Sequence, residues 1–171
     1  MQGIYKGKKY RVAKDSTSFW LVSREKEEGF EEYIDIVGEK RPDIFIKDVD
    51  IHELDYLYKM AYEIQYKGHF YIFENGDFTK RAIAEEAFYI LSDDVSNPKF
   101  FQNLGFTQSD KFYFDKKISR SDIEAIKIIE KPLGIFKDRG SKVKIIKGKD
   151  IDDFLASVKD GSLSNSVDEE F

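Results

Sequence analysis

The residues that could carry catalysis are few in this sequence. Its 171 residues include no cysteine and two histidines, His52 and His69, which excludes thiolate nucleophiles, disulfides and zinc–thiolate sites. A catalytic histidine needs a partner that orients it, and the sequence supplies none for His69. We therefore interpret His69 as the start of a strand and His52 as an exposed residue in the first turn of a helix.

Adjacent carboxylates are the second group that could support chemistry. A hydrolytic or metal role requires acids that converge from different elements, whereas adjacent acids in a chain that is 36% charged are typical of a solvated face. We therefore assign no catalytic residue, metal ligand or cofactor, and we predict that the protein is not an enzyme. The acid pairs are Glu27-Glu28, Glu31-Glu32, Glu85-Glu86, Asp93-Asp94 and Asp152-Asp153.

The charge balance narrows the class of partner. Asp and Glu number 33 against 28 Lys and Arg, so the formal net charge is −5. Phosphate contacts give a nucleic-acid binder a basic excess, so nucleic acid is not the expected partner, although residues 137–149 are locally basic. An acidic surface suits a basic protein partner. The sequence shows no long apolar stretch and no signal peptide, so we expect a cytoplasmic protein without membrane association.

One segment, residues 25–35, has the composition of a protein interface. It combines an acidic rim with aromatic side chains, the pattern of an anchor surrounded by charges. The alternative is a solvated loop whose Phe30 is buried in the core, as its match Phe106 suggests. The candidate partner-binding residues are Glu25, Glu27, Glu28, Phe30, Glu31, Glu32, Tyr33 and Asp35.

An internal duplication organises the chain. Four blocks recur in the same order, which predicts a first repeat at 1–64, a second at 65–136 and an extension with an acidic tail at 137–171. The matched blocks are Tyr5-Lys6-Gly7 with Tyr66-Lys67-Gly68, Phe19–Ser23 with Phe88–Ser92, Gly29-Phe30 with Gly105-Phe106, and Phe45–Leu57 with Phe114–Ile126.

Each repeat is expected to contain strands followed by a helix. Aromatic and β-branched runs predict strands at 10–12, 19–23 and 45–49, and again at 71–73, 88–92 and 112–118. A small helix is expected to begin after Ser96 or Asn97, either of which could cap it, with Pro98 in the first turn.

Capping-box-like pairs suggest where the longer helices begin. Asp50 with Glu53, and Ser119 with Asp122, precede apolar residues at helical spacing, which predicts helices over 50–64 and 119–131. A strand at 143–146 and a helix from Asp150 follow. The expected fold class is α+β: two tandem ββ(α)βα repeats with small antiparallel sheets, plus a short C-terminal strand and helix.

The pattern resembles a known group of proteins. The paired Tyr-Lys-Gly strand starts, the Gly-Phe step, and the endings Val-Asp-x-x-Glu-Leu (49–54) and Ile-Ser-x-x-Asp-Ile (118–123) resemble small duplicated bacterial immunity proteins of polymorphic or contact-dependent toxin systems. The resemblance covers residues 1–136. It implies a cytoplasmic, cofactor-free protein that binds one cognate toxin, such as a basic nuclease, and blocks its active surface. It assigns no contact residues.

Two other classes of function stay open. A small ligand-binding or scaffold domain would show a large apolar pocket between the two halves. A metal-dependent hydrolase would bring separated carboxylates together and would respond to magnesium or manganese.

Overall fold

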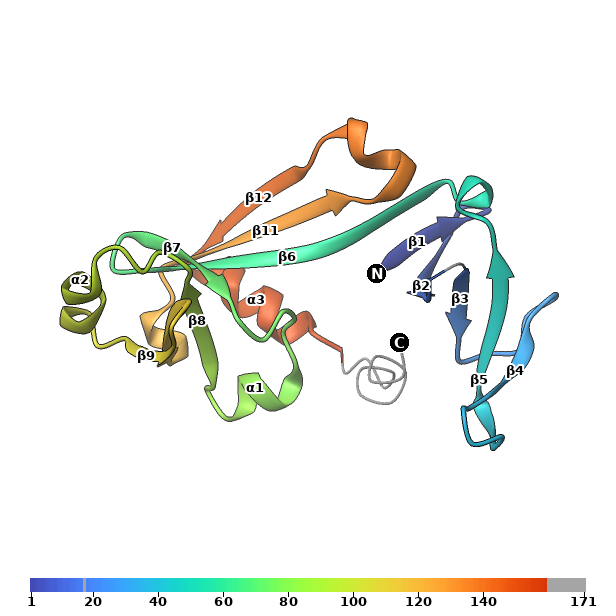
Figure 1. Cartoon of the computed structure of the whole chain (residues 1–171), viewed down its shortest axis with the longest axis horizontal. Helices are drawn as coiled ribbons and strands as arrows, with labels where there is room; N and C mark the ends of the chain where they lie inside the picture. The colour runs from blue at the N-terminus through green and yellow to red at the C-terminus, as the bar shows by residue number, and fades with distance from the viewer. Residues whose placement is uncertain (17, 160–171) are drawn as a thin grey trace. The chain divides into compact units, whose positions relative to one another are not determined.

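The structure is mostly antiparallel β-sheet. This computed structural model describes residues 1–16 and 18–159, and twelve strands lie in that part of the chain (Figure 1). The described residues divide into two compact units. Among the described residues, unit 1 comprises 1–59 and 131–141, and unit 2 comprises 60–130 and 142–159.

Unit 1 is built on strands in the order β4-β5-β3-β2-β1, with the start of β6 paired to β1. Burial alternates along β2, where Tyr10 and Val12 are buried and Arg11 between them is partly exposed, as expected for a strand with one face on a core. The elements are β1 (Gln2–Tyr5), β2 (Lys8–Lys14), β3 (Phe19–Ser23), β4 (Glu31–Ile34), β5 (Lys40–Val49), β6 (Tyr56–Tyr66) and the 3₁₀ helices η1 (Ile51–Glu53) and η3 (Gly134–Arg139).

Unit 2 continues from the end of β6 in the order β6-β7-β8-β10-β9, and β11 pairs with β12. Its core is aromatic: Phe88 and Phe114 are fully buried, and Phe73 stacks on Phe78 at 4.3 Å between ring centroids. The elements are β7 (His69–Phe73), α1 (Lys80–Ala84), β8 (Phe88–Ser92), α2 (Pro98–Asn103), β9 (Thr107–Asp110), β10 (Tyr113–Ile118), η2 (Arg120–Asp122), β11 (Ala125–Pro132), β12 (Lys142–Lys147) and α3 (Lys149–Ser157).

The α+β fold class expected from the sequence is wrong. The two ββ(α)βα repeats with small sheets and closing helices are not formed, because the segments expected as helices over 50–64 and 119–131 are strands β6 and β11. The described residues instead form a twelve-stranded, mostly antiparallel sheet with short helices between the strands.

The capping pairs that suggested these helices are real, but each ends after one 3₁₀ turn. The Asp50 carboxylate accepts a hydrogen bond from the His52 amide, and Glu53 accepts one from the Asp50 amide at 2.7 Å. Leu54 is already extended. The tyrosines of β6 and the isoleucines of β11 are aromatic and β-branched residues that favour strands, so tertiary pairing overrides the helical spacing.

Several shorter elements were predicted correctly from the sequence. Phe19–Ser23 and Phe88–Ser92 are confirmed as strands, and the small helix α2 begins after Asn97, whose side chain accepts from the Phe100 amide. The C-terminal strand and helix are confirmed as β12 and α3. The acidic tail lies outside the described residues, and the repeat boundaries at 64 and 136 stay a prediction.

The two hairpins that begin with Tyr-Lys-Gly have the same backbone. Lys6 and Gly7 have φ of 49° and 76°, and Lys67 and Gly68 have φ of 47° and 82°. Positive φ at both central residues is the requirement of a type I′ turn, whose twist matches that of the flanking strands. Each turn therefore fixes the lysine that it carries at the same place relative to its hairpin.

Candidate functional site

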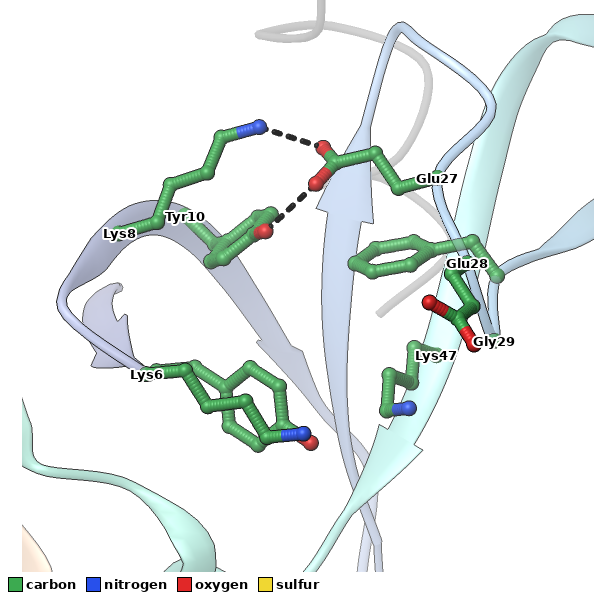
Figure 2. Close-up of a pocket in the computed structure, with 9 residues that line it drawn as sticks. Lys6, Lys8, Tyr10, Glu27, Glu28, Gly29 and Lys47 are labelled. Carbon is green, nitrogen blue, oxygen red and sulfur yellow. Dashed lines mark hydrogen bonds and ion pairs between the residues drawn. The ribbon is translucent and has the colours of Figure 1, made fainter.

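A pocket of about 490 Å³ lies in unit 1, between the β1–β2 turn, the segment that precedes β4, and strand β5 (Figure 2). It brings part of the predicted acidic segment against three lysines from other elements. We call it the lysine pocket. Its lining residues are Tyr5, Lys6, Lys8, Tyr10, Glu27, Glu28, Gly29, Phe30 and Lys47.

Glu27 is the centre of a polar network on one wall of this pocket. Its carboxylate lies 2.8 Å from the Lys8 ammonium and accepts a hydrogen bond from the Tyr10 hydroxyl at 2.7 Å (Figure 2). It also accepts one from the Ser23 hydroxyl at 3.0 Å. The hydrogen bond from Lys8, followed by that from Tyr10, lowers the pKa of Glu27. Glu27 is therefore held as a carboxylate that fastens its loop to β2 and β3.

Aromatic rings support the wall behind this network. The Tyr10 ring stacks on Phe30, with centroids 5.6 Å apart, and the Tyr5 ring meets Tyr10 edge-on at 6.5 Å. All three side chains are largely buried. Phe30 therefore packs in the core of unit 1, as the alternative reading of the sequence allowed.

Two further lysines stand around the ring of Tyr5. The ammonium nitrogen of Lys6 lies 5.3 Å from the ring centroid and that of Lys47 lies 5.7 Å from it. Gly29 has φ of +79°, and a Cβ atom there would lie 2.6 Å from the Lys47 nitrogen. A glycine at this position lets the lysine lie against the backbone of the loop (Figure 2).

The other predicted interface residues separate into exposed and buried sets. Glu25, Glu28, Glu31 and Glu32 are exposed, whereas Phe30, Tyr33 and Asp35 are buried. Tyr33 packs with Ala13, Val22 and Ile44 in a small core cluster. The structure thus brings Glu27, Glu28 and Phe30 to the lysine pocket. Glu25 lies just after β3, and the other predicted residues lie on or next to strand β4.

The sequence analysis missed the exposed aliphatic residues at the tip of the β4–β5 hairpin, which lie beside the predicted residue Asp35. The buried Asp35 carboxylate accepts hydrogen bonds from the amides of Val37 at 3.1 Å and Glu39 at 2.8 Å, and lies 3.4 Å from the Arg41 guanidinium. Ile34, Ile36 and Val37, which we call the apolar tip, are 54%, 85% and 76% exposed. The spacing Asp-x-x-Gly at 35–38 is turn chemistry that could have revealed this hairpin.

Unit 2 contains a cluster of matching side chains, which we call the counterpart cluster, and its polar contacts differ from those of the lysine pocket. Lys116 stands 5.8 Å from the Tyr66 ring centroid and donates a hydrogen bond to the Gly105 carbonyl at 3.2 Å. Tyr71 contacts Phe106 at 5.0 Å, yet its buried hydroxyl has no hydrogen-bond partner among the described residues. The carboxylate that serves Tyr10 in unit 1 therefore has no equivalent here.

The remaining candidate residues are distributed over both units. His52 contacts the Asp50 carboxylate at 2.7 Å, and His69 meets the Phe100 ring edge-on at the start of β7. The basic segment 137–149 is divided between η3, β12 and the start of α3. Within residues 1–16 and 18–159, no three His, Asp or Glu side chains are grouped so that they could hold a metal ion. No helix in the same part of the chain is long and apolar enough to cross a membrane.

Comparison with known proteins places the chain in a family. No curated protein and no solved structure gives a significant match. One family model, described as "Uncharacterised conserved protein UCP033725", matches residues 1–133, which is more than half of the chain and includes the lysine pocket and its counterpart cluster in unit 2. The chain therefore belongs to this family of conserved proteins.

Proposed function

We propose that this protein is a non-enzymatic, cytoplasmic inhibitor of another protein, specifically an immunity protein that neutralises a cognate bacterial toxin by covering its active surface. The observation that carries the proposal is the apolar tip. Its three exposed aliphatic side chains are the last residue of β4 and two residues of the following turn, whose amides at Val37 and Glu39 donate to the buried Asp35 carboxylate. The resemblance of residues 1–136 to duplicated immunity proteins supports the same reading.

The apolar tip has the properties of a binding surface. Removal of aliphatic surface from water is favourable by about 25 cal/mol per Å², so contact with a partner stabilises these side chains. Because Asp35 already fixes the turn, little conformational freedom remains to be lost on binding. A rigid apolar protrusion of this kind fits a recess on a protein partner.

The charges next to the apolar tip suggest that the partner surface is positively charged. Glu31 and Glu32 are exposed on β4, which pairs only with β5 among the described strands and so forms the end of the strand order in unit 1. Glu25 and Glu28 are exposed in the segment before it. Carboxylates beside an apolar anchor accelerate encounter with a basic surface. A basic nuclease toxin is a partner of this class.

The test is co-expression with the product of the adjacent upstream gene, followed by measurement of the complex and of host survival. A 1:1 complex that rescues growth supports the proposal. The variant Ile36→Ser with Val37→Ser should lose both the complex and the rescue. A toxic neighbour that remains unbound, or full binding by a folded tip variant, would refute it.

A matched control variant is available in unit 2. Val143 and Ile145 of β12 are also exposed aliphatic residues, at 57% and 49%. The variant Val143→Ser with Ile145→Ser removes the same kind of surface from a different strand. It should keep both the complex and the rescue, which separates a specific role of the tip from a general loss of surface hydrophobicity.

Ligand binding is the second candidate function, and one observation favours it. The lysine pocket is a cavity of defined lining within unit 1. It is polar and charged, unlike the apolar pocket that the sequence analysis associated with a ligand-binding domain.

A further inference from the structure

We propose that the lysine pocket is an oxyanion-binding site in which Lys6 and Lys47 hold a phosphate or carboxylate group beside Tyr5. This inference goes beyond the proposed function and does not depend on it. It rests on the charges that the pocket leaves unpaired, and on a comparison with the counterpart cluster of unit 2.

The pairing of charges inside the pocket leaves a positive excess. Glu27 is engaged by Lys8, Tyr10 and Ser23. Lys6 and Lys47 have no carboxylate partner among the described residues, and both contact the ring of Tyr5. Glu28 is the one other charged side chain of the lining. Two unpaired lysines against one glutamate give a net positive site in a chain whose formal charge is −5, and such a site attracts an anion.

The comparison between the units shows that the lysine of β5 is available to a ligand. In unit 2 the Lys116 ammonium donates to the Gly105 carbonyl at 3.2 Å. Lys47 occupies the matching position beside Gly29 but makes no such hydrogen bond among the described residues. The donors of Lys47 are therefore free to meet an oxyanion, whereas Lys116 is partly satisfied by the protein itself.

Both lysines are presented by ordered backbone. Lys6 occupies the first central position of the type I′ turn, and Lys47 lies in strand β5, paired with Leu21 of β3. Their side chains enter the pocket from different elements (Figure 2). A site carried by a turn and a strand has little freedom to lose when the ligand binds. Lysine ammonium groups act as point charges toward oxyanions, so phosphate and carboxylate share the chemistry required.

The experiment is a titration of the full chain with sodium phosphate and, separately, with sodium acetate, at constant ionic strength because salt screens such contacts. Backbone amide resonances of Gly29 and Lys47 are followed by NMR, with those of Gly105 and Lys116 as the internal reference. We expect saturating shifts in unit 1 and none in unit 2. Saturation with both anions supports a general oxyanion site, and saturation with one assigns the group.

Variants test the assignment of the two lysines. Lys47→Gln should weaken anion binding about tenfold, the effect of one lost hydrogen bond to a charged group. The matched variant Lys116→Gln in unit 2 should leave binding unchanged. Lys47→Arg should retain it, because the positive charge is kept. Glu28→Gln should tighten it, because the opposing negative charge is removed.

The variant Lys6→Gln tests the same site if Lys47→Gln unfolds the protein, because Lys6 is exposed at a turn. Lys6→Gln should then weaken anion binding in a folded chain. Shifts that never saturate, equal shifts at Gly29 and Gly105, or unchanged affinity in both lysine variants would overturn the proposal. The tip variant Ile36→Ser with Val37→Ser should bind the anion normally, so failure of the protein-binding function and failure of the anion site give different results.

Discussion

The carboxylate of Asp55 accepts a hydrogen bond from the amide of Gly7 at 3.0 Å, which ties the β1–β2 turn to the residue before β6. Unit 2 has the same relationship, in which Glu124 accepts from the amide of Gly68 at 3.0 Å. In both units the backbone amide of the acid also bonds to the first hairpin strand: Asp55 donates to the Ile4 carbonyl at 2.8 Å, and Glu124 donates to that of Gln65 at 2.9 Å.

These acids should stabilise their units to a similar degree. Asp55→Ala and Glu124→Ala each remove an acceptor from an exposed turn amide, which typically lowers the free energy of unfolding by about 1 kcal/mol. Urea unfolding of each variant measures the effect. Asp55→Asn keeps a carbonyl acceptor and should lose less. Equal stability of wild type and both alanine variants would show that the turns hold without the carboxylates.

The hydroxyls of Tyr10 and Tyr71 should have different effects on the free energy of unfolding. Tyr10 donates to Glu27 at 2.7 Å, whereas the buried Tyr71 hydroxyl has no partner among the described residues. Tyr10→Phe should therefore lower the free energy of unfolding by about 1 kcal/mol. Tyr71→Phe should leave it unchanged or raise it, because an unsatisfied buried polar group is removed. Guanidinium unfolding compares the two, and a clear loss for Tyr71→Phe would contradict the structure.

Stability should depend on pH through Glu27 and Lys8. The hydrogen bond from Lys8 lowers the pKa of Glu27, so its stabilisation is present above the unfolded pKa and is lost as pH falls through the folded pKa. The hydrogen bond to Glu27 raises the pKa of Lys8, so that contribution is present below the unfolded pKa and is lost as pH rises through the folded one.

The measurement is the difference in free energy of unfolding between wild type and Glu27→Gln across pH. The difference should be largest near neutral pH and should shrink at both extremes. Asp50 and Asp94 also have a lowered pKa, through hydrogen bonds involving His52 and Ser96. The Glu27→Gln variant keeps both, so their acid loss cancels in the difference. A difference that stays constant with pH would argue against the Lys8–Glu27 contact.

At the β4–β5 hairpin the buried Asp35 should matter for stability, whereas the exposed side chains of the apolar tip should not. Asp35→Ala leaves two turn amides without their acceptor and should lower the free energy of unfolding by about 1–3 kcal/mol. Ile36→Ser and Val37→Ser change side chains that stand in water, and each should alter it by less than about 0.5 kcal/mol. Thermal unfolding of the three variants checks this order. A large loss for either serine variant would mean that these residues are covered in the folded chain.

Short aromatic and β-branched runs predicted strands correctly, whereas the two longer predicted helices are strands in the structure. Runs such as Phe19–Ser23 and Phe88–Ser92 have strand composition and strand structure. The segments after Asp50 and Ser119 combined a genuine capping box with helical spacing, and two local signals agreed on the wrong element. What decided their structure is pairing with distant strands, as Gly3 pairs with Leu57 across β1 and β6, and such pairing leaves no trace in a local pattern.

The candidate site could be predicted in part. The composition of residues 25–35 pointed to Glu27 and Glu28, but it could not show that Lys6 and Lys47, from other elements, complete the same pocket. A usable signal existed in the duplication, because Gly29 matches Gly105 and Lys47 matches Lys116. A glycine and a lysine repeated together indicate a close approach of side chain to backbone, which the structure shows in both units.

Strand β6 has a consequence for any attempt to separate the two repeats. Its first residues pair with β1, and its last residues pair with β7. Ile64, just before the predicted repeat boundary, is fully buried in the core cluster of unit 2. A fragment ending at this residue would expose the Ile64 side chain to water, and the core of unit 2 would lack that side chain. Cutting the chain at this boundary therefore removes part of the core of unit 2.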